Sequence, residues 1–222
     1  MMDMSTWMAA YKAAMLESFG DRVRFIGLQG SRGRGEAGPD SDIDAVLILD
    51  RLDPADLAAY RDAAEDLPER DKLCGFVSGA AELAAWDRGE LFQFRHDTTD
   101  LYGRLSDLLM PEQPGDARRA LHTAACGIYH LSCHNGIHGR DLAAAESACK
   151  GAVFGLQAKL YLETGTYYRR HRDLETALTG TDLAVFRAAE AIRRAEHPMD
   201  LDALTALLLA WSGEILRRWA ED

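Results

Sequence analysis

Four residues in the first quarter of the chain have the types and spacing of a site for a metal ion and phosphate: Gly30, Ser31, Asp42 and Asp44. The first two form a Gly-Ser dipeptide, and a single apolar residue, Ile43, separates the two acids. In an extended segment alternate side chains point the same way, so the two carboxylates converge while Ile43 points into the core. The pattern therefore predicts paired acids beside a turn that bears a hydroxyl group.

Paired acids of this kind favour binding of a divalent cation. Two like charges so close together destabilise each other unless a cation lies between them, and hard carboxylate oxygens select Mg²⁺ or Mn²⁺ rather than zinc. Magnesium leaves positions for substrate phosphates. We therefore expect Asp42 and Asp44 to hold the metal, and Gly30 and Ser31 to cradle the phosphates of a nucleoside triphosphate. The alternative is a glycine-rich hairpin with two solvated aspartates, since Gly and Asp are common turn residues.

Two apolar segments must position these residues, one on each side of the motif. Residues 23–30 and 43–49 are rich in β-branched and apolar side chains and are bounded by turn residues. Each segment predicts a buried strand, and the motif between them is expected at a sheet edge. The other elements of this half are expected to be helices over 54–67 and 80–86 and extended segments over 72–78 and 90–94.

The organisation changes at a linker over residues 111–115, which contains two prolines and a glycine. Beyond it, helical patterns are expected over 116–138, 141–164, 169–178, 182–196 and 201–219. The residues expected at helix ends are Gly139, Gly165 and Gly180, and those expected as N-caps are Asp141, Asp182 and Asp200. The sequence therefore predicts an α+β fold with a first domain over 1–111 and a helical bundle domain over 112–222.

The motif resembles the signature of the DNA polymerase β-type nucleotidyltransferase superfamily. That signature is Gly-Ser, a short spacer and two acids separated by one hydrophobic residue, and Gly30, Ser31, Asp42 and Asp44 match it one by one. An α/β head followed by helices is also similar to aminoglycoside nucleotidyltransferases of the kanamycin and streptomycin types. The resemblance implies a polymerase β-like head with a small mixed sheet, an all-α second domain, ATP as donor and a homodimer that can complete the site.

Composition narrows the class of substrate. The chain has 222 residues and a formal net charge of -11, which argues against a protein that grips a nucleic acid backbone with clustered Lys and Arg. The N-terminal segment predicts a helix ended by Gly20 rather than a signal peptide, so we expect a cytoplasmic protein with no membrane segment. The cysteines lack CxxC spacing, and reduced core thiols are expected at Cys74, Cys126, Cys133 and Cys149.

The third predicted strand departs from the superfamily pattern. A catalytic site of this type normally has a third acid there, but the central positions are Cys74, Gly75, Phe76 and Val77. The flanking acids, Asp71 and Glu82, are expected to lie off the strand. The base that accepts the proton must then come from elsewhere, or the reaction runs without one, or catalysis is lost.

A pair on a helix of the second domain is the first candidate to fill this gap. In kanamycin-type enzymes the general base is a Glu on such a helix, with a Lys one turn later that touches phosphate. Glu146 and Lys150 have this spacing, and we assign Glu146 as the base and Lys150 as a nucleotide contact. The alternatives are an ordinary surface ion pair between the two, or a base from His130 or His134 on the preceding helix.

Two further sets of residues have alternative interpretations. Arg32 and Arg34 lie beside the predicted phosphate site, where a guanidinium can bind phosphate, and we assign Arg32 to the nucleotide. In the alternative interpretation, the two arginines lie in a mobile loop and pair with Glu36 or Asp40. On the helix that carries His130 and His134, these two residues recur at intervals of four with Cys126 and His138. One interpretation is a zinc site; the other is that Cys126 packs in the core while one or two of the histidines line the cleft and the others are wet.

Together these features predict a metal-dependent nucleotidyltransferase. It would move a nucleoside monophosphate, AMP from ATP, onto a hydroxyl group of a small molecule such as an aminoglycoside-type antibiotic, and release pyrophosphate. Two alternatives belong to other classes. One is an antitoxin-type nucleotidyltransferase that modifies a protein partner, and the other is a non-catalytic nucleotide-binding sensor, which the missing third acid suggests.

Overall fold

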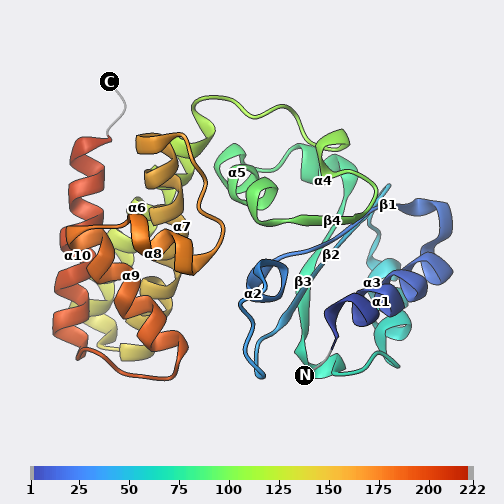
Figure 1. The fold of residues 1–222 in the computed structure, drawn as a ribbon, viewed down its shortest axis with the longest axis horizontal. Helices are drawn as coiled ribbons and strands as arrows, with labels where there is room; N and C mark the ends of the chain where they lie inside the picture. Colours follow the sequence, from blue (N-terminus) through green and yellow to red (C-terminus); the bar gives the residue numbers. More distant parts are fainter. Residues whose placement is uncertain (1–2, 220–222) are drawn as a thin grey trace. The chain divides into compact units, whose positions relative to one another are not determined.

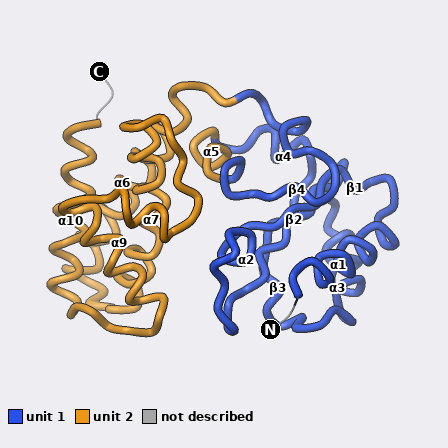
Figure 2. The backbone as a smooth tube through the Cα atoms, in the orientation of Figure 1, with its two compact units in different colours: residues 1–87, 94–111 blue, residues 88–93, 112–222 orange. Residues whose placement is uncertain are grey.

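A computed structural model describes residues 3–219 of the chain (Figure 1). The chain divides into two compact units, each with its own buried core (Figure 2). The first unit contains residues 1–87 and 94–111, and the second contains residues 88–93 and 112–222. The short segment 88–93 therefore belongs with the helical unit, although it precedes the last part of the first unit in the chain.

The first unit is built on a mixed sheet with the strand order β3-β2-β1-β4. Its strands are β1 (Val23–Leu28), β2 (Ile43–Leu49), β3 (Leu73–Gly79) and β4 (Thr99–Tyr102). β1 is antiparallel to β2 and to β4, whereas β2 and β3 are parallel. This small mixed sheet confirms the predicted class of the head. The expected position of the motif at a sheet edge is wrong, because β1 and β2 are interior strands. Gly30 and Ser31 follow β1, Asp42 precedes β2, and Asp44 lies within β2.

Helices α1 (Met4–Phe19) and α3 (Pro54–Ala64) pack on one face of this sheet. Their apolar side chains form a core with every second residue of β2, from Ile43 to Leu49. α1 begins after Asp3, whose carboxylate accepts hydrogen bonds from two backbone amides, and it ends at Gly20, as predicted. Because alternate residues of β2 are committed to this core, the remaining ones, including Asp44, must point to the opposite face.

Two short helices follow strands of the sheet: α2 (Gly30–Arg34) follows β1, and α4 (Ala80–Ala84) follows β3. The expectation of an extended segment over 90–94 is wrong, because these residues lie in helix α5 (Arg88–Asp97). Leu91 and Phe92 are both buried, and the Phe92 ring packs on Tyr161 of the second unit with centroids 5.0 Å apart. Tertiary packing therefore outweighs the local sequence pattern in this segment.

The second unit consists of helices that pack around one apolar core. Besides the start of α5 they are α6 (Asp116–His134), α7 (Leu142–Thr164), α8 (His171–Ala177), α9 (Gly180–Arg193) and α10 (Leu201–Arg218). Leu156, Phe186, Leu208 and Trp211 lie at its centre, each no more than 1% exposed. Gly155 of α7 leaves room for the Trp211 indole, since a Cβ there would lie 2.9 Å from the ring. This unit confirms the predicted helical bundle.

Half of the helix ends follow the sequence signals. Asp141 and Asp200 cap α7 and α10 by accepting hydrogen bonds from backbone amides, and Gly165 ends α7 with φ of 73°. Gly139 does not end α6 directly, because the helix continues as a π-helical turn over Asn135–Gly139 that ends at Arg140. The left-handed backbone that closes this turn therefore falls on an arginine, with φ of 50°.

The expected roles of Gly180 and Asp182 are also wrong. Gly180 is the first residue of α9, whose N-cap is Thr179, and Asp182 lies in the first turn. One Asp182 oxygen accepts a hydrogen bond from Lys159 Nζ at 2.5 Å, and the other accepts one from the Trp211 indole N–H at 2.9 Å. Asp182 therefore ties α9 to α7 and α10 through groups that are almost fully buried.

The cysteines are less buried than expected. Cys74 and Cys126 are exposed and Cys133 is partly exposed, so the expectation of core thiols is wrong for these three. Cys149 is fully buried, and this burial raises the pKa of its thiol to about 12. No helix in the described part of the chain is both long and apolar enough to cross a membrane.

The Asp182 contacts give a prediction for stability. Asp182→Ala should lower the free energy of unfolding by about 3–5 kcal/mol, because it leaves a buried ammonium group and a buried indole N–H without an acceptor. Urea denaturation measures the loss. The matched control is Asp202→Ala, which removes a solvent-exposed ion pair with Arg140 and should cost at most about 1 kcal/mol. Equal losses in the two variants would contradict this role for Asp182.

Candidate functional site

The contact between Gly30 and Asp44 defines the candidate site. Gly30 has φ of 65°, and a Cβ added to it would lie 1.8 Å from Oδ2 of Asp44. Glycine is thus required here twice, once for its backbone conformation and once for the space that the carboxylate occupies. The preceding residue, Gln29, donates its backbone N–H to the carbonyl of Asp44 at 2.9 Å, which fixes the start of α2 beside β2.

The two acids of the motif act on each other. Asp44 lies within β2 and is partly buried, whereas Asp42 precedes the strand and is exposed, with the fully buried Ile43 between them. Burial and then the negative charge of Asp42 raise the pKa of Asp44, while Arg34 and Arg32 oppose the rise. The net direction is upward because burial, which is the largest cause, and the charge of Asp42 together outweigh the two arginines. A cation beside Asp44 would favour the ionised carboxylate and lower this pKa.

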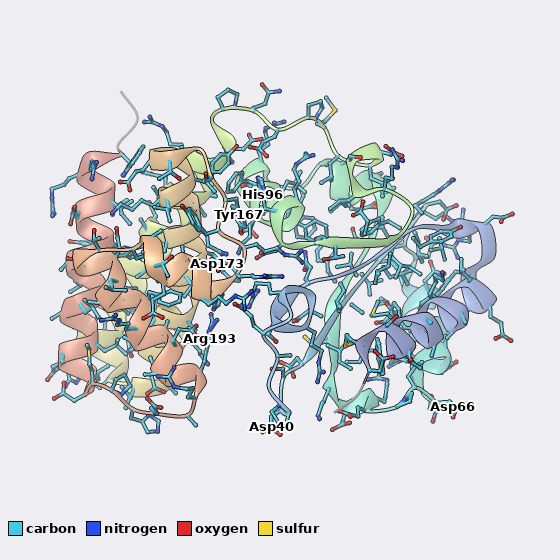
Figure 3. All side chains as sticks on the ribbon, in the orientation of Figure 1. Asp40, Asp66, His96, Tyr167, Asp173 and Arg193 are labelled. Carbon is cyan, nitrogen blue, oxygen red and sulfur yellow. The ribbon has the colours of Figure 1, made fainter. Side chains whose placement is uncertain are left out.

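The two arginines of the motif have different partners. Arg32 Nη2 donates to the Ser41 carbonyl at 2.7 Å, and its Nε donates to the carbonyls of Ser41 and Asp42 at 3.2 and 3.0 Å. Arg34 pairs with Glu36, one of the partners expected in the loop interpretation, at 3.1 Å. Asp40 lies in the same loop between α2 and β2 (Figure 3). The bonds of Arg32 support a role in holding the backbone at Asp42.

Ser31 follows Gly30 as the second residue of α2 and is partly exposed. Its carbonyl accepts the backbone N–H of Glu36 at 2.8 Å, and Gly35 ends the helix with φ of 72°. The turn is therefore closed on itself by backbone hydrogen bonds. This closure leaves Gly30 and Ser31 next to each other at the start of the turn, beside Asp44.

The strand register shows what replaces a third acid. β3 pairs with β2 so that Cys74 lies beside Asp44 and Phe76 lies beside Val46. Asp71 lies in a 3-10 turn before β3, and Glu82 lies in α4 after it, so neither is on the strand. Within residues 3–219, no three His, Cys, Asp or Glu side chains are grouped closely enough to hold a metal ion. The acids available here are Asp42 and Asp44.

Glu146 and Lys150 lie on α7 of the second unit, while the Gly-Ser motif lies in the first. Glu146 accepts a hydrogen bond from His197 Nδ1 at 2.6 Å, and its side chain is 13% exposed. Lys150 is exposed, and its backbone carbonyl accepts from Arg193 at 3.1 Å. Glu146 therefore pairs with the imidazole of His197, in place of the surface ion pair with Lys150 that was the alternative interpretation.

The recurring histidines lie on an exposed surface, His130 and His134 in α6 and His138 in the π-helical turn that follows it. The ring centroids of His130 and His134 are 6.2 Å apart, and those of His134 and His138 are 5.1 Å apart. Cys126 has its sulfur 3.7 Å from a ring nitrogen of His122 rather than beside His130. The histidines are therefore exposed along this surface, and the expectation that Cys126 packs in the core is wrong, because Cys126 is exposed.

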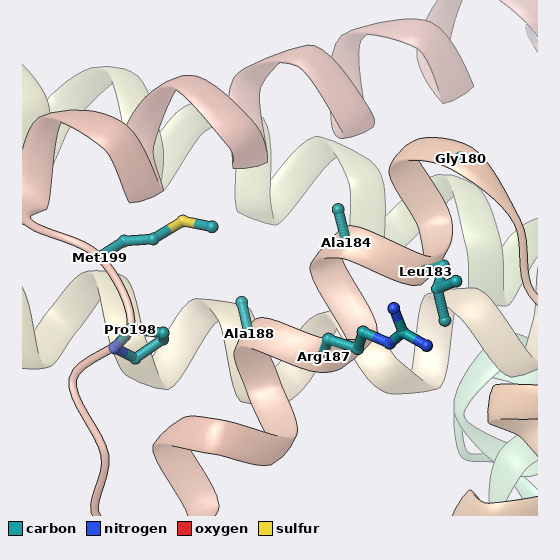
Figure 4. Close-up of a pocket in the computed structure, with 7 residues that line it drawn as sticks. All are labelled: Gly180, Leu183, Ala184, Arg187, Ala188, Pro198 and Met199. Atoms are coloured by element: carbon teal, nitrogen blue, oxygen red, sulfur yellow. The ribbon is translucent and has the colours of Figure 1, made fainter.

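A hollow in the second unit contains none of the motif residues. It is bounded by α9 and the segment before α10, with a volume of about 380 Å³ (Figure 4). The residues that line it are mostly apolar: Gly180, Leu183, Ala184, Arg187, Ala188, Pro198 and Met199. Arg187, its charged residue, pairs with Glu175 at 3.1 Å. This hollow adds no group to the candidate site.

The motif did not predict the role of Gln29, which helps to position Asp44. Gln29 binds Asp44 through its backbone, and its side-chain amide donates to Thr98 Oγ1 at 2.7 Å. The Thr98 hydroxyl in turn bonds the carbonyl of Phe94. A lone polar residue at the end of an apolar strand is the signal that could have pointed to this chain of hydrogen bonds.

The comparisons with known proteins agree with this geometry. Residues 10–109 match the family model of the nucleotidyltransferase domain. No curated protein sequence matches the chain. The crystal structure of spectinomycin adenyltransferase AAD(9) from Enterococcus faecialis, with ATP and spectinomycin, shares the fold with a TM-score of 0.59. The match covers 97% of this chain and 100% of that one at 12% sequence identity. The chain therefore carries a nucleotidyltransferase domain followed by a helical unit, and its enzyme class is that of the nucleotidyltransferases.

Proposed function

We propose that the chain transfers AMP from ATP to a hydroxyl group of a small, aminoglycoside-type molecule in a metal-dependent reaction that releases pyrophosphate. The observation that carries the proposal is the pair of interacting acids, Asp42 and Asp44, of which Asp44 packs against Gly30. The fold shared with spectinomycin adenyltransferase AAD(9) supports ATP as donor and an antibiotic as acceptor. A role in antibiotic resistance within the cytoplasm follows from this assignment. The homodimer stays a prediction.

The donor set of the site fits Mg²⁺ or Mn²⁺. Carboxylate oxygens are preferred ligands of both ions, and Mg²⁺ commonly binds through one or two carboxylates together with substrate phosphates. Asp42 and Asp44 would hold the ion; burial, and then the charge of Asp42, raise the pKa of Asp44, and a cation would oppose both effects by favouring the ionised carboxylate. When bound, the metal would neutralise charge on the phosphates of the donor and on the departing pyrophosphate.

The remaining residues of the motif would orient the donor. Gly30 and Ser31 would cradle phosphate oxygens, because a glycine allows close backbone approach and the serine supplies a hydroxyl donor. Arg32 would keep Asp42 in place through the backbone carbonyls that it already binds. The acceptor oxygen would form a bond to the α-phosphorus in line with the bond that breaks to pyrophosphate. Holding the acceptor and the donor in this alignment would therefore account for much of the rate enhancement.

Glu146 is the proposed general base, and Lys150 is the proposed phosphate contact. The hydrogen bond from His197 would orient the Glu146 carboxylate, which then accepts the proton of the acceptor hydroxyl. A Glu146→Gln variant should lower kcat and change the pH profile of kcat while leaving the affinity for Mg²⁺ and ATP unchanged. Unchanged kcat would place the base elsewhere in the chain.

Pyrophosphate release with ATP, Mg²⁺ and a panel of aminoglycoside and spectinomycin-type acceptors tests the proposed function. Asp42→Asn and Asp44→Asn should each lower the acceptor-dependent rate by about 100-fold or more, because each removes a charged ligand at the centre of the reaction. Asp40→Asn, in the same loop, is the matched control and should keep the rate of the unmodified chain.

The outcome also separates the alternatives. Release that is unaffected by the two substitutions would contradict the proposal. Metal-dependent ATP binding without release would favour the non-catalytic sensor, and release that requires a protein acceptor would favour the antitoxin-type enzyme.

A further prediction concerns Arg32. Arg32→Lys keeps the positive charge but cannot hold the two carbonyls with a planar fork, so kcat should fall by about 10- to 100-fold with little change in the KM for ATP. Steady-state kinetics measure both constants. Arg34→Lys is the control, since a lysine can still pair with Glu36. Full activity of Arg32→Lys, with a raised KM for ATP in Arg32→Gln, would instead indicate a direct contact with phosphate.

A further inference from the structure

An aromatic cluster lies on the same face of the sheet as Asp44. In the parallel pair of β2 and β3, Asp44 is in register with Cys74, and Val46 with Phe76. Paired residues of neighbouring strands point to the same face, and alternate residues share a face. Phe76 therefore lies on the Asp44 face, two residues along the strand. The other face of β2 is covered by the core with α1 and α3.

Phe76 packs with two rings that come from outside the sheet. Its centroid is 5.4 Å from that of Trp86 with the planes at 83°, and 4.9 Å from that of Phe94 with the planes at 63°. These are favourable edge-to-face contacts. Trp86 is nevertheless 44% exposed, and Phe76 and Phe94 are only partly buried. All three residues belong to the first unit.

These rings serve neither buried core of the described residues. The core beneath α1 and α3 and the core of the helical unit are formed by other side chains. A large indole left partly in water gains little from burial, whereas it offers a flat surface to a planar ligand. The cluster therefore has the properties of a stacking surface rather than of a core.

We propose that Trp86, with Phe76 and Phe94 behind it, stacks on the base of the donor nucleotide whose phosphates would bind at Gly30 and Ser31 and at the metal held by Asp42 and Asp44. This inference rests on the proposed function and adds a base-binding subsite to it. Phe76 lies two residues along and one strand across from Asp44, which corresponds to about 8 Å between their α-carbons. A ribose separates a base from its α-phosphate by a distance of this order, so one nucleotide can reach both places.

The chemistry of the surface selects a nucleobase. Every base has a π-face that stacks on aromatic side chains, and such stacking tolerates different bases because it uses no hydrogen-bond pattern. An aminocyclitol acceptor has no π-face and could meet the rings only through its C–H and ammonium groups, so a planar base makes the larger stacked contact. The subsite should therefore accept ATP and GTP with similar affinity and bind pyrimidine nucleotides, which have smaller rings, more weakly.

Equilibrium titration with two ligands tests the subsite, both in the presence of Mg²⁺: ATP and inorganic tripolyphosphate. Trp86→Leu should weaken ATP binding about tenfold and leave tripolyphosphate binding unchanged, because only ATP has a base. Trp86→Phe should retain most of the ATP affinity. The control is Tyr102→Leu, which removes another exposed ring of the first unit and should change neither affinity.

Other results would overturn the inference in distinguishable ways. Equal affinity of Trp86→Leu and the unmodified chain for ATP, or equal losses for ATP and tripolyphosphate, would exclude base stacking at Trp86. If Trp86→Leu does not fold, Phe94→Leu replaces it with the same expected difference between the two ligands. Absence of metal-dependent binding of either ligand to the unmodified chain would instead contradict the proposed function itself.

Discussion

The candidate site depends on the close approach of the Asp44 carboxylate to the α-carbon of Gly30. A side chain at residue 30 would collide with Oδ2 of Asp44, and the positive φ of Gly30 would strain any other residue. The hydrogen bond from Gln29 to the carbonyl of Asp44 and the antiparallel register of β1 with β2 hold the two segments together. The whole motif is thus a small unit of backbone geometry that keeps one carboxylate partly buried.

Keeping an acid in this position costs stability, and the surroundings of the site show how the cost is limited. Burial and Asp42 raise the pKa of Asp44, while Arg32 and Arg34 lower it without cancelling the rise. The same guanidinium of Arg32 holds the loop carbonyls, so one residue both moderates the charge and fixes the backbone. In the second unit, the partly buried carboxylate of Asp182 already has its partners, the buried side chains of Lys159 and Trp211. That contrast separates an acid with a structural role from one that is available to a ligand.

Much of this arrangement could be predicted from the sequence. The strands around the motif and most helices follow from apolar runs and periodicity, and Gly20, Gly165, Asp141 and Asp200 act as the helix ends that their types suggest. The spacing of the motif also indicated which acids would converge, although their roles as ligands remain a proposal.

Other features depend on tertiary contacts that one sequence does not display. Residues 90–94 are helical because Leu91 and Phe92 are both buried, and Asp182 bonds a lysine and a tryptophan from distant helices instead of capping its own helix. The hydrogen bonds of Arg32 to loop carbonyls and the register that places Cys74 beside Asp44 likewise appear only in three dimensions.

Titration of Mn²⁺ in the presence of ATP, followed by the electron paramagnetic resonance of free Mn²⁺, tests the central claim most directly. Gly30→Ala should weaken Mn²⁺ binding at least about tenfold at pH 8, because it displaces the Asp44 carboxylate, whereas Gly38→Ala, in open surroundings, should not. Since the pKa of Asp44 is raised, protons compete with the metal, and the affinity of the unmodified chain should fall as the pH is lowered toward 5. Equal Mn²⁺ affinity in Gly30→Ala and Gly38→Ala would contradict the claim that this contact forms the metal site.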